Sequence, residues 1–314
     1  MRLRLLAVSS LLALATVASA ADPQLLKLVM PDAKVVSGID IDKVRSTPFG
    51  MFFLNQLPAP DSEFQQFVNA TGFDPRRDIH EVLMASPGDP AKKSGLLVVR
   101  GDFDTARILA LFAAMGKTPE VYKSVAILSS GAPKKANAVS EAFAFLDKST
   151  AVAGDLDSVH GAIDRRISDG GSLDAGLAGK IGSTSATQDA WVVSIVPFSS
   201  FANVVPNKNV SGALQGDLIK SIQQSSGGVK FGSMIEISGE LTARNDQDAT
   251  SLADVLKFFM SMAQMNAPSH AELGKLLQNL TVNTEANAVK VSLAIPEIEM
   301  EMLFKMTGHQ APRI

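Results

Sequence analysis

The sequence predicts an α+β protein made of two similar half-domains, each a largely antiparallel sheet that amphipathic helices cover on one face. One observation behind this prediction is a repeat, because residues 32–37 (DAKVVS) recur as 189–194 (DAWVVS) with five of six residues identical. Another is that the predicted elements follow in the same order after each copy. In addition, neighbouring predicted strands have hairpin-like spacing, which needs no crossover helix and so indicates antiparallel pairing.

Alternating and β-branched apolar residues predict the strands of the first unit, and apolar residues at helical spacing predict its helices. The elements are, in order, a strand at 32–37, helices at 43–57 and 61–70, strands at 81–86 and 95–100, a helix at 104–115, strands at 142–147 and 150–154, and a helix at 156–168.

The second unit repeats this order with different spacings. Its elements are a strand at 189–194, a helix at about 211–225, a strand at 229–238, a helix at 248–265, a hairpin at 280–289 and a helix at 297–306. Two units are too few for a solenoid and leave either two half-domains or one continuous sheet. The predicted organisation is a leader at 1–20, a first repeat at 21–170, a Gly- and Ser-rich linker at 171–188 with a short helix at 173–180, a second repeat at 189–308 and a tail at 309–314.

The first twenty residues have the features of a secretory signal peptide. Arg2 and Arg4 precede an apolar run from Leu5 to Val17, and Ala18-Ser19-Ala20 forms a cleavage site. The run is too short to span a bilayer, so we expect cleavage after Ala20 and no integral membrane segment afterwards. The alternative is a buried N-terminal helix. The leader predicts a periplasmic or secreted bacterial protein.

The composition excludes several classes of function. The chain has no cysteine, which rules out disulfides, thiolate metal sites and cysteine nucleophiles. Its formal net charge is −3 and its basic residues occur as scattered pairs, which does not predict a nucleic-acid partner. A hydrophobic content of 46% predicts a substantial core.

An Asp-x-Asp pattern occurs four times where a helix is predicted to begin. Paired carboxylates could hold calcium, but an Asp at this position more commonly caps a helix by accepting hydrogen bonds from its first N–H groups. The pattern lacks the glycine and distal glutamate of an EF-hand loop, so capping is the preferred interpretation. The four occurrences are Asp40/Asp42, Asp102/Asp104, Asp155/Asp157 and Asp246/Asp248.

Known catalytic and cofactor motifs are incomplete in this chain. His80-Glu81 begins like a zincin motif, but Met84 stands where the second histidine is required. Gly116-Lys117-Thr118 resembles the end of a phosphate-binding loop, but Leu111 stands where the first glycine is required. We therefore predict no catalytic residue, no metal site and no cofactor.

Methionine and phenylalanine are concentrated on predicted helix faces. Methionine thioethers could bind Cu(I), but these residues share apolar stripes and are expected to fill core space. The methionines are Met260, Met262, Met265, Met300, Met302 and Met306. Phe52, Phe53, Phe64, Phe67, Phe258 and Phe259 are also expected in the core, with some of them lining an apolar cavity. The candidate apolar ligand face is Phe258, Phe259, Met262 and Met265 on the 248–265 helix.

Several segments resemble an uncharacterised family of secreted bacterial proteins. They are Pro31–Ala33 with Val35–Asp40, Thr71–Ile79, Leu96–Gly101, Phe143–Asp147, Ala153–Asp155 and Val159–Arg165. The resemblance covers most of the chain after the leader and implies a secreted α+β domain. It carries no assigned activity and therefore transfers no functional residue.

Together, these features favour a non-catalytic extracytoplasmic protein that binds or scaffolds something in the cell envelope, with an envelope protein or an apolar ligand as the expected partner. The first alternative is a carrier of lipid or other apolar small molecules, because helix faces rich in Phe and Met set against a sheet can open a groove. The second is a hydrolase with an unrecognised site, which would place His80, His160 or His270 in a cleft beside Ser and Asp.

Overall fold

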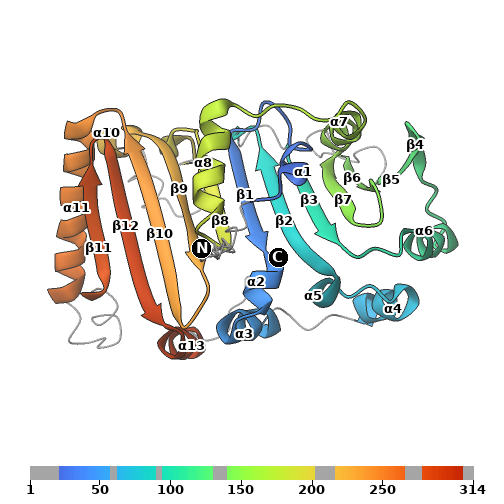
Figure 1. Ribbon diagram of the computed structural model, residues 1–314, viewed down its shortest axis with the longest axis horizontal. Coiled ribbons are helices and arrows are strands. Elements are labelled where there is room, and N and C mark those ends of the chain that lie inside the picture. Colours follow the sequence, from blue (N-terminus) through green and yellow to red (C-terminus); the bar gives the residue numbers. More distant parts are fainter. Residues whose placement is uncertain are drawn as a thin grey trace, which may run out of the picture.

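The computed structural model describes residues 21–56, 62–89, 94–129, 140–201, 216–265 and 278–306. A 12-stranded antiparallel sheet runs through this part of the chain in the order β11-β12-β10-β9-β8-β1-β2-β3-β7-β6-β5-β4 (Figure 1). The α+β class predicted from the sequence is confirmed. The leader at 1–20 and the tail at 309–314 lie outside the described residues.

The sheet is built from strands of three to ten residues. They are β1 (Val35–Asp40), β2 (Ile79–Ser86), β3 (Leu96–Gly101), β4 (Glu120–Tyr122), β5 (Val125–Ser129), β6 (Glu141–Phe145), β7 (Thr150–Asp155), β8 (Ala190–Ser194), β9 (Ile222–Lys230), β10 (Met234–Ala243), β11 (Leu280–Glu285) and β12 (Ala288–Pro296).

Aspartate caps begin several of the helices, as the Asp-x-Asp pattern predicts. Asp40, Asp104 and Asp155 each accept a hydrogen bond from a backbone N–H in the first turn of the helix that follows. The fourth pattern differs, because Asn245 accepts from the N–H of Asp248. The helical segments are α1 (Pro23–Leu26), α2 (Ile41–Arg45), α3 (Pro48–Gln56), α4 (Ser62–Thr71), α5 (Pro75–Asp78), α6 (Thr105–Ala114), α7 (Leu156–Ile167), α8 (Ala175–Ser185), η1 (Phe198–Phe201), α10 (Asp217–Lys220), α11 (Asp246–Met265) and α13 (Glu297–Met306).

The two predicted units share one continuous sheet. Their first strands, β1 and β8, pair at its centre, so the first unit lies on one side and the second on the other (Figure 1). Outward from this pair the orders are β1-β2-β3-β7-β6 and β8-β9-β10-β12-β11, which match position by position. The first unit adds the β5-β4 hairpin at its edge. Duplication of an ancestral unit remains a prediction.

Two predicted elements of the second unit are wrong. The helix predicted at about 211–225 is reduced, among the described residues, to α10, and residues 222–225 already belong to β9. The single strand predicted at 229–238 is two strands, β9 and β10, with a turn between them. Local propensity is overridden here because β9 pairs with β8 on one side and β10 on the other.

Helices lie on both faces of the sheet. Face A is the side of Val36, Val98 and Val193, and α1, α7 and α8 pack on it in one core (Figure 1). Face B is the opposite side, which carries Leu97 and Leu241. The predicted helices at 104–115 and 248–265 correspond to α6 and α11, and both cover face B, α11 in a smaller second core. The centre of the sheet is therefore helix-covered on face A, whereas face B is covered towards its two ends.

Gly38 and Trp191 hold the two halves together at the central β1–β8 pair. They lie opposite each other in the register, and a Cβ atom added at Gly38 would come within 2.5 Å of the Trp191 ring. We therefore expect Gly38→Ala to lower the free energy of unfolding by roughly 1–3 kcal/mol through overpacking. Urea denaturation would measure this loss. Gly179 is exposed on α8, and a Cβ atom added there meets no atom within 4 Å, so Gly179→Ala should be neutral or stabilising. Equal effects of both variants would contradict the expectation.

Candidate ligand-binding face

A row of apolar side chains crosses the part of face B that helices leave uncovered. The strand registers place Met84 opposite Leu97, Leu97 opposite Ala153, Ala153 opposite Phe143, and Phe143 opposite Leu128. Directly opposed residues in antiparallel strands point to the same side, so these five residues form one continuous row. Met84 keeps 57% of its surface exposed. Five neighbouring strands thus carry an apolar row that is exposed at Met84 and half-buried at its other four residues.

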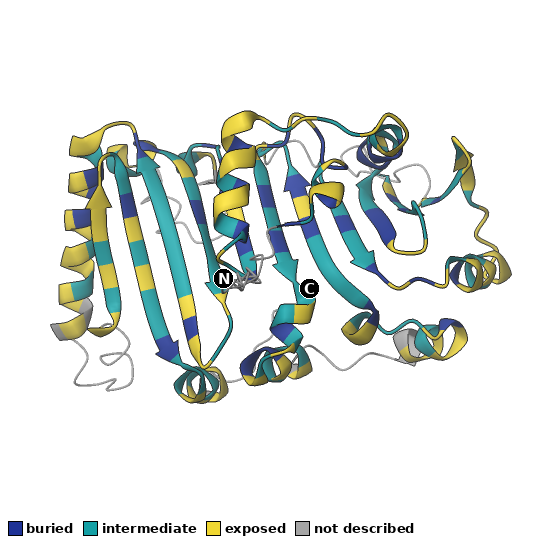
Figure 2. Ribbon diagram, in the orientation of Figure 1, coloured by how far each residue is buried: buried dark blue, intermediate teal, exposed yellow. Residues whose placement is uncertain are grey.

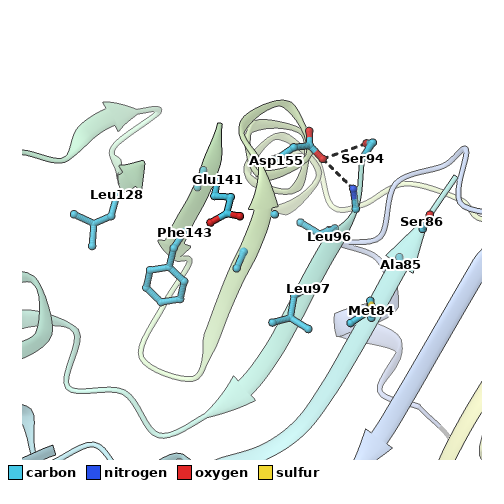
Figure 3. A pocket seen from close by; sticks show the side chains of 14 residues that line it. Met84, Ala85, Ser86, Ser94, Leu96, Leu97, Leu128, Glu141, Phe143 and Asp155 are labelled. Atoms are coloured by element: carbon cyan, nitrogen blue, oxygen red, sulfur yellow. Dashed lines mark hydrogen bonds between the residues drawn. The ribbon is translucent and has the colours of Figure 1, made fainter. Parts of the chain in front are cut away.

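An open hollow of about 950 Å³ lies over this row. Leu128, Phe143, Leu97 and Met84 form its apolar part, and all four point to the same side of the sheet (Figure 3). Its volume is within the range of small-molecule sites. A predominantly apolar lining with few polar groups is the usual composition of a ligand site.

Polar residues are confined to the end of the hollow where β2 and β7 end and β3 and β6 begin. They are Ser86, Ser94, Glu141 and Asp155 (Figure 3). Asp155 accepts hydrogen bonds from Ser94 Oγ at 3.1 Å, Gly95 N at 3.0 Å and Ser158 Oγ at 2.6 Å. Burial opposes ionisation of this carboxyl, but the donated hydrogen bonds outweigh burial and lower its pKa. Asp155 is therefore an ionised structural group with its oxygens already engaged.

A smaller chamber of about 300 Å³ lies on the same face towards the other end of the strands. It lies between the sheet and helices α4 and α6 and is partly open to solvent. Phe143 belongs to the walls of both the hollow and the chamber. The remaining chamber walls are apolar: Phe67, Phe73, Ile79, Val99, Phe103, Ile108, Phe112, Phe145 and Ala151.

The ligand face predicted on α11 lies elsewhere. Ala249, Leu252 and Ala253 pack inward, while Phe258 and Phe259 are 64% and 53% exposed. Exposed residues recur along α11 (Figure 2). The expectation that these two phenylalanines belong to the core is therefore wrong. Met262 is also exposed, and the side chain of Met265 is outside the described part. The α11 residues remain a predicted face, separate from the hollow, because α11 covers β10, β11 and β12.

The other phenylalanines have different surroundings. Phe67 lines the chamber, in agreement with the expectation that some of these residues line an apolar cavity. Phe52 and Phe53 are half-buried against Phe304 of α13, with ring centroids 5.9 and 6.0 Å away. The side chain of Phe64 is not among those described. Met84, Leu97 and Leu128 were not predicted as binding residues, although the unbroken apolar runs 82–85 and 96–99 indicate strands that are apolar on both faces.

The described histidines have no serine hydrogen-bonded to them. His80 lies between two aspartates, with Nδ1 at 2.9 Å from Asp42 and Nε2 at 3.1 Å from Asp102. His160 stacks on the Tyr122 ring with centroids 4.2 Å apart. His270 and His309 fall outside the described residues. The geometry that would favour a hydrolase is therefore not found at His80 or His160.

His80 makes folding stability depend on pH. The hydrogen bonds to Asp42 and then Asp102 raise its pKa above the ordinary value of 6.5. The contribution of His80 to the free energy of unfolding is therefore fully present below about pH 6.5. It is lost as the pH rises through the raised pKa of the folded state. We expect wild type to exceed His80→Gln in unfolding free energy by up to roughly 1 kcal/mol at low pH, with a smaller difference at high pH. Urea titrations across this range would measure it, and a pH-independent difference would contradict the assignment.

The described residues show neither a metal-ion cluster nor a membrane-spanning helix. Within these ranges no cluster of three or more His, Asp or Glu residues is arranged to hold a metal ion. None of the described helices combines the length and apolar character needed to cross a bilayer.

Comparisons with known proteins give a structural likeness but no family. No family model matches the chain, and no curated protein matches it. Among solved structures, the chain is similar to one described as "Structure of crystal form I of TP0453". The two share 10% sequence identity with a TM-score of 0.48, over 93% of this chain and 100% of the other. What this protein binds therefore has to be inferred from its own residues.

Proposed function

We propose that this is a non-catalytic extracytoplasmic protein of the cell envelope that carries an apolar or amphiphilic small molecule on face B. One observation carries the proposal: the open hollow over Met84, Leu97, Phe143 and Leu128 is apolar along its length and polar at one end only. The predicted leader supports the extracytoplasmic location.

The row under the hollow differs in composition from face A of the second unit. There the strands carry the polar residues Ser226, Glu240 and Lys290. The row on face B has no such residue from Leu128 to Met84. Contiguous exposed apolar surface on a globular protein commonly marks a binding site. A ligand covering this row gains the free energy of removing apolar surface from water, about 25 cal/mol per Å².

The chemistry at the polar end supports binding over catalysis. Asp155 is held ionised by hydrogen bonds to Ser94, Gly95 and Ser158, so it serves the fold at the start of α7. The other carboxyl there, Glu141, lies at the exposed start of β6. A general base needs a positioned acid or nucleophile as a partner, and among the described residues that line the hollow there is no histidine or lysine.

One observation favours a second candidate, a scaffold that docks another envelope protein. Phe258, Phe259 and Met262 form an exposed apolar stripe on α11, in T-shaped contact at the two phenylalanines. Exposed aromatic clusters of this kind are enriched at protein interfaces. If α11 docks a partner, Phe258→Glu should abolish a discrete complex isolated from envelope extracts while ligand binding in the hollow is retained.

Two measurements test the carrier proposal. Native mass spectrometry of the chain from Ala21 to Ile314, purified gently from its own compartment, should show an additional apolar molecule that is lost on denaturation. After removal of that ligand, the fluorescent probe N-phenylnaphthylamine should bind saturably and be displaced by acyl-chain amphiphiles. A clean unliganded mass together with no saturable probe binding would overturn the proposal.

A further inference from the structure

We propose, on the basis of the proposed function, that the ligand is a single-chain amphiphile whose tail end enters the chamber beneath α6. The rest of the chain then lies over the row of face B, and the head group lies at the Ser86 and Ser94 end of the hollow. The chamber thereby sets an upper limit on chain length.

The chamber walls admit only apolar groups. Aromatic and aliphatic side chains from β2, β3, β6, β7, α4, α6 and the loops next to them line it, and no polar side chain is among the described lining residues. A hydroxyl, amide or charge placed there would lose its hydrogen bonds to water without replacement. The end of a hydrocarbon chain makes no hydrogen bonds to water and therefore loses none on entering the chamber. The tail, not the head, is therefore the end that enters.

The chamber has the size and composition of a ligand site. It is a partly open cleft of about 300 Å³, at the lower end of the range of small-molecule pockets. Its described lining is apolar, so an apolar guest that covers it removes apolar surface from water.

The chamber and the hollow line up along the strands. Ile79 at the start of β2 lines the chamber, and Ser86 at its end lines the hollow. These residues are seven positions apart, which corresponds to about 23 Å along a strand. Phe143 stands at the boundary, with its ring 4.7 Å from the ring of Phe145. An extended chain lying along β3 and β6 would therefore pass from the chamber into the hollow beside Phe143.

Ala151 and Ala153 make a matched pair for testing this arrangement. Both lie on β7 and point to face B, but Ala151 lines the chamber and Ala153 lines the hollow. Ala151→Leu fills chamber space and should not destabilise the fold. Ala153→Leu adds the same atoms outside the chamber. Val99→Phe, on β3 in the chamber wall, provides a second filled variant in case Ala151→Leu folds poorly.

The experiment is displacement of N-phenylnaphthylamine by monoacylglycerols from octanoyl to stearoyl, with wild type and each variant. In wild type we expect affinity to rise about fourfold per added methylene until the chamber is full, and then to stop rising. Ala151→Leu and Val99→Phe should reach this limit at a shorter chain, by about three carbons for the added leucine atoms. Ala153→Leu changes the row under the bound chain, so it should alter the affinity for all chain lengths alike and keep the wild-type limit.

The outcomes separate the two proposals. If every monoacylglycerol fails to displace the probe from wild type, the carrier function itself is overturned. If wild type binds the series but the chain-length limit is the same in Ala151→Leu, Val99→Phe and Ala153→Leu, the carrier function stands and the chamber assignment is overturned. A shorter chain-length limit in Ala151→Leu and Val99→Phe, but not in Ala153→Leu, supports both the carrier function and the chamber assignment.

Discussion

Replacing Leu97 with aspartate is expected to lower the affinity for an acyl-chain amphiphile by at least about thirtyfold, or ~2 kcal/mol. Leu97 lies in the middle of the row, opposite Met84 on one side and Ala153 on the other. Without ligand its side chain faces the open hollow, so a carboxylate there stays hydrated. A bound chain would cover that carboxylate and remove its water. Titration with N-phenylnaphthylamine measures the loss.

Val192→Asp is the matched control for this variant. Val192 continues the same row on face B, beyond Ser37, and is 44% exposed, but it does not line the hollow. It should bind the probe like wild type. Both variants should keep the wild-type melting temperature, because each changes an accessible side chain. Equal loss of binding in both variants, or none in either, would contradict the placement of the site.

Replacing Trp191 with alanine is expected to cost about 3–5 kcal/mol of unfolding free energy, the largest stability effect that we predict. Trp191 is only 7% exposed and belongs to the main core on face A. Its ring lies over Gly38 of the neighbouring strand and near Leu83. Truncation would leave a cavity at the β1–β8 pair, where the two halves of the sheet meet.

Circular dichroism during urea denaturation is the suitable readout, because the variant removes the one tryptophan of the chain. Trp191→Phe keeps an aromatic ring and should lose markedly less unfolding free energy than Trp191→Ala. Val192→Ala, one position along but on face B, should be close to neutral. A Trp191→Ala variant as stable as Val192→Ala would show that the central strand pair does not depend on this ring.

The sequence predicts the local structure better than the pairing across the sheet. Asp40, Asp104 and Asp155 cap helices as expected because capping depends only on the residues that follow. Hairpin spacing likewise predicts the β6–β7 and β11–β12 pairs. The β1–β8 pair joins residues more than 150 positions apart, and no local signal could specify it. The same reason explains β9, whose Ser- and Gly-rich sequence becomes a strand only between β8 and β10.

The site was harder to predict because it depends on what covers each face. The alternation along β3 places Leu96 and Val98 on face A and Leu97 and Val99 on face B. The sequence shows that both sets are apolar but not that Val99 lies under α6 while Leu97 faces a hollow. On α11 the apolar arc is wider than the sheet contact, so Phe258 and Phe259 are exposed although their spacing suggested core.

Photo-crosslinking with a single-chain amphiphile that carries a diazirine at the end of its tail tests the central claim most directly. We expect the label on peptides that contain Phe103, Ile108 and Phe112, which line the chamber. A diazirine placed near the head group should instead label the region of Ser86 and Ser94. Labelling confined to the α11 stripe around Phe258, or spread evenly over the surface, would contradict binding on face B.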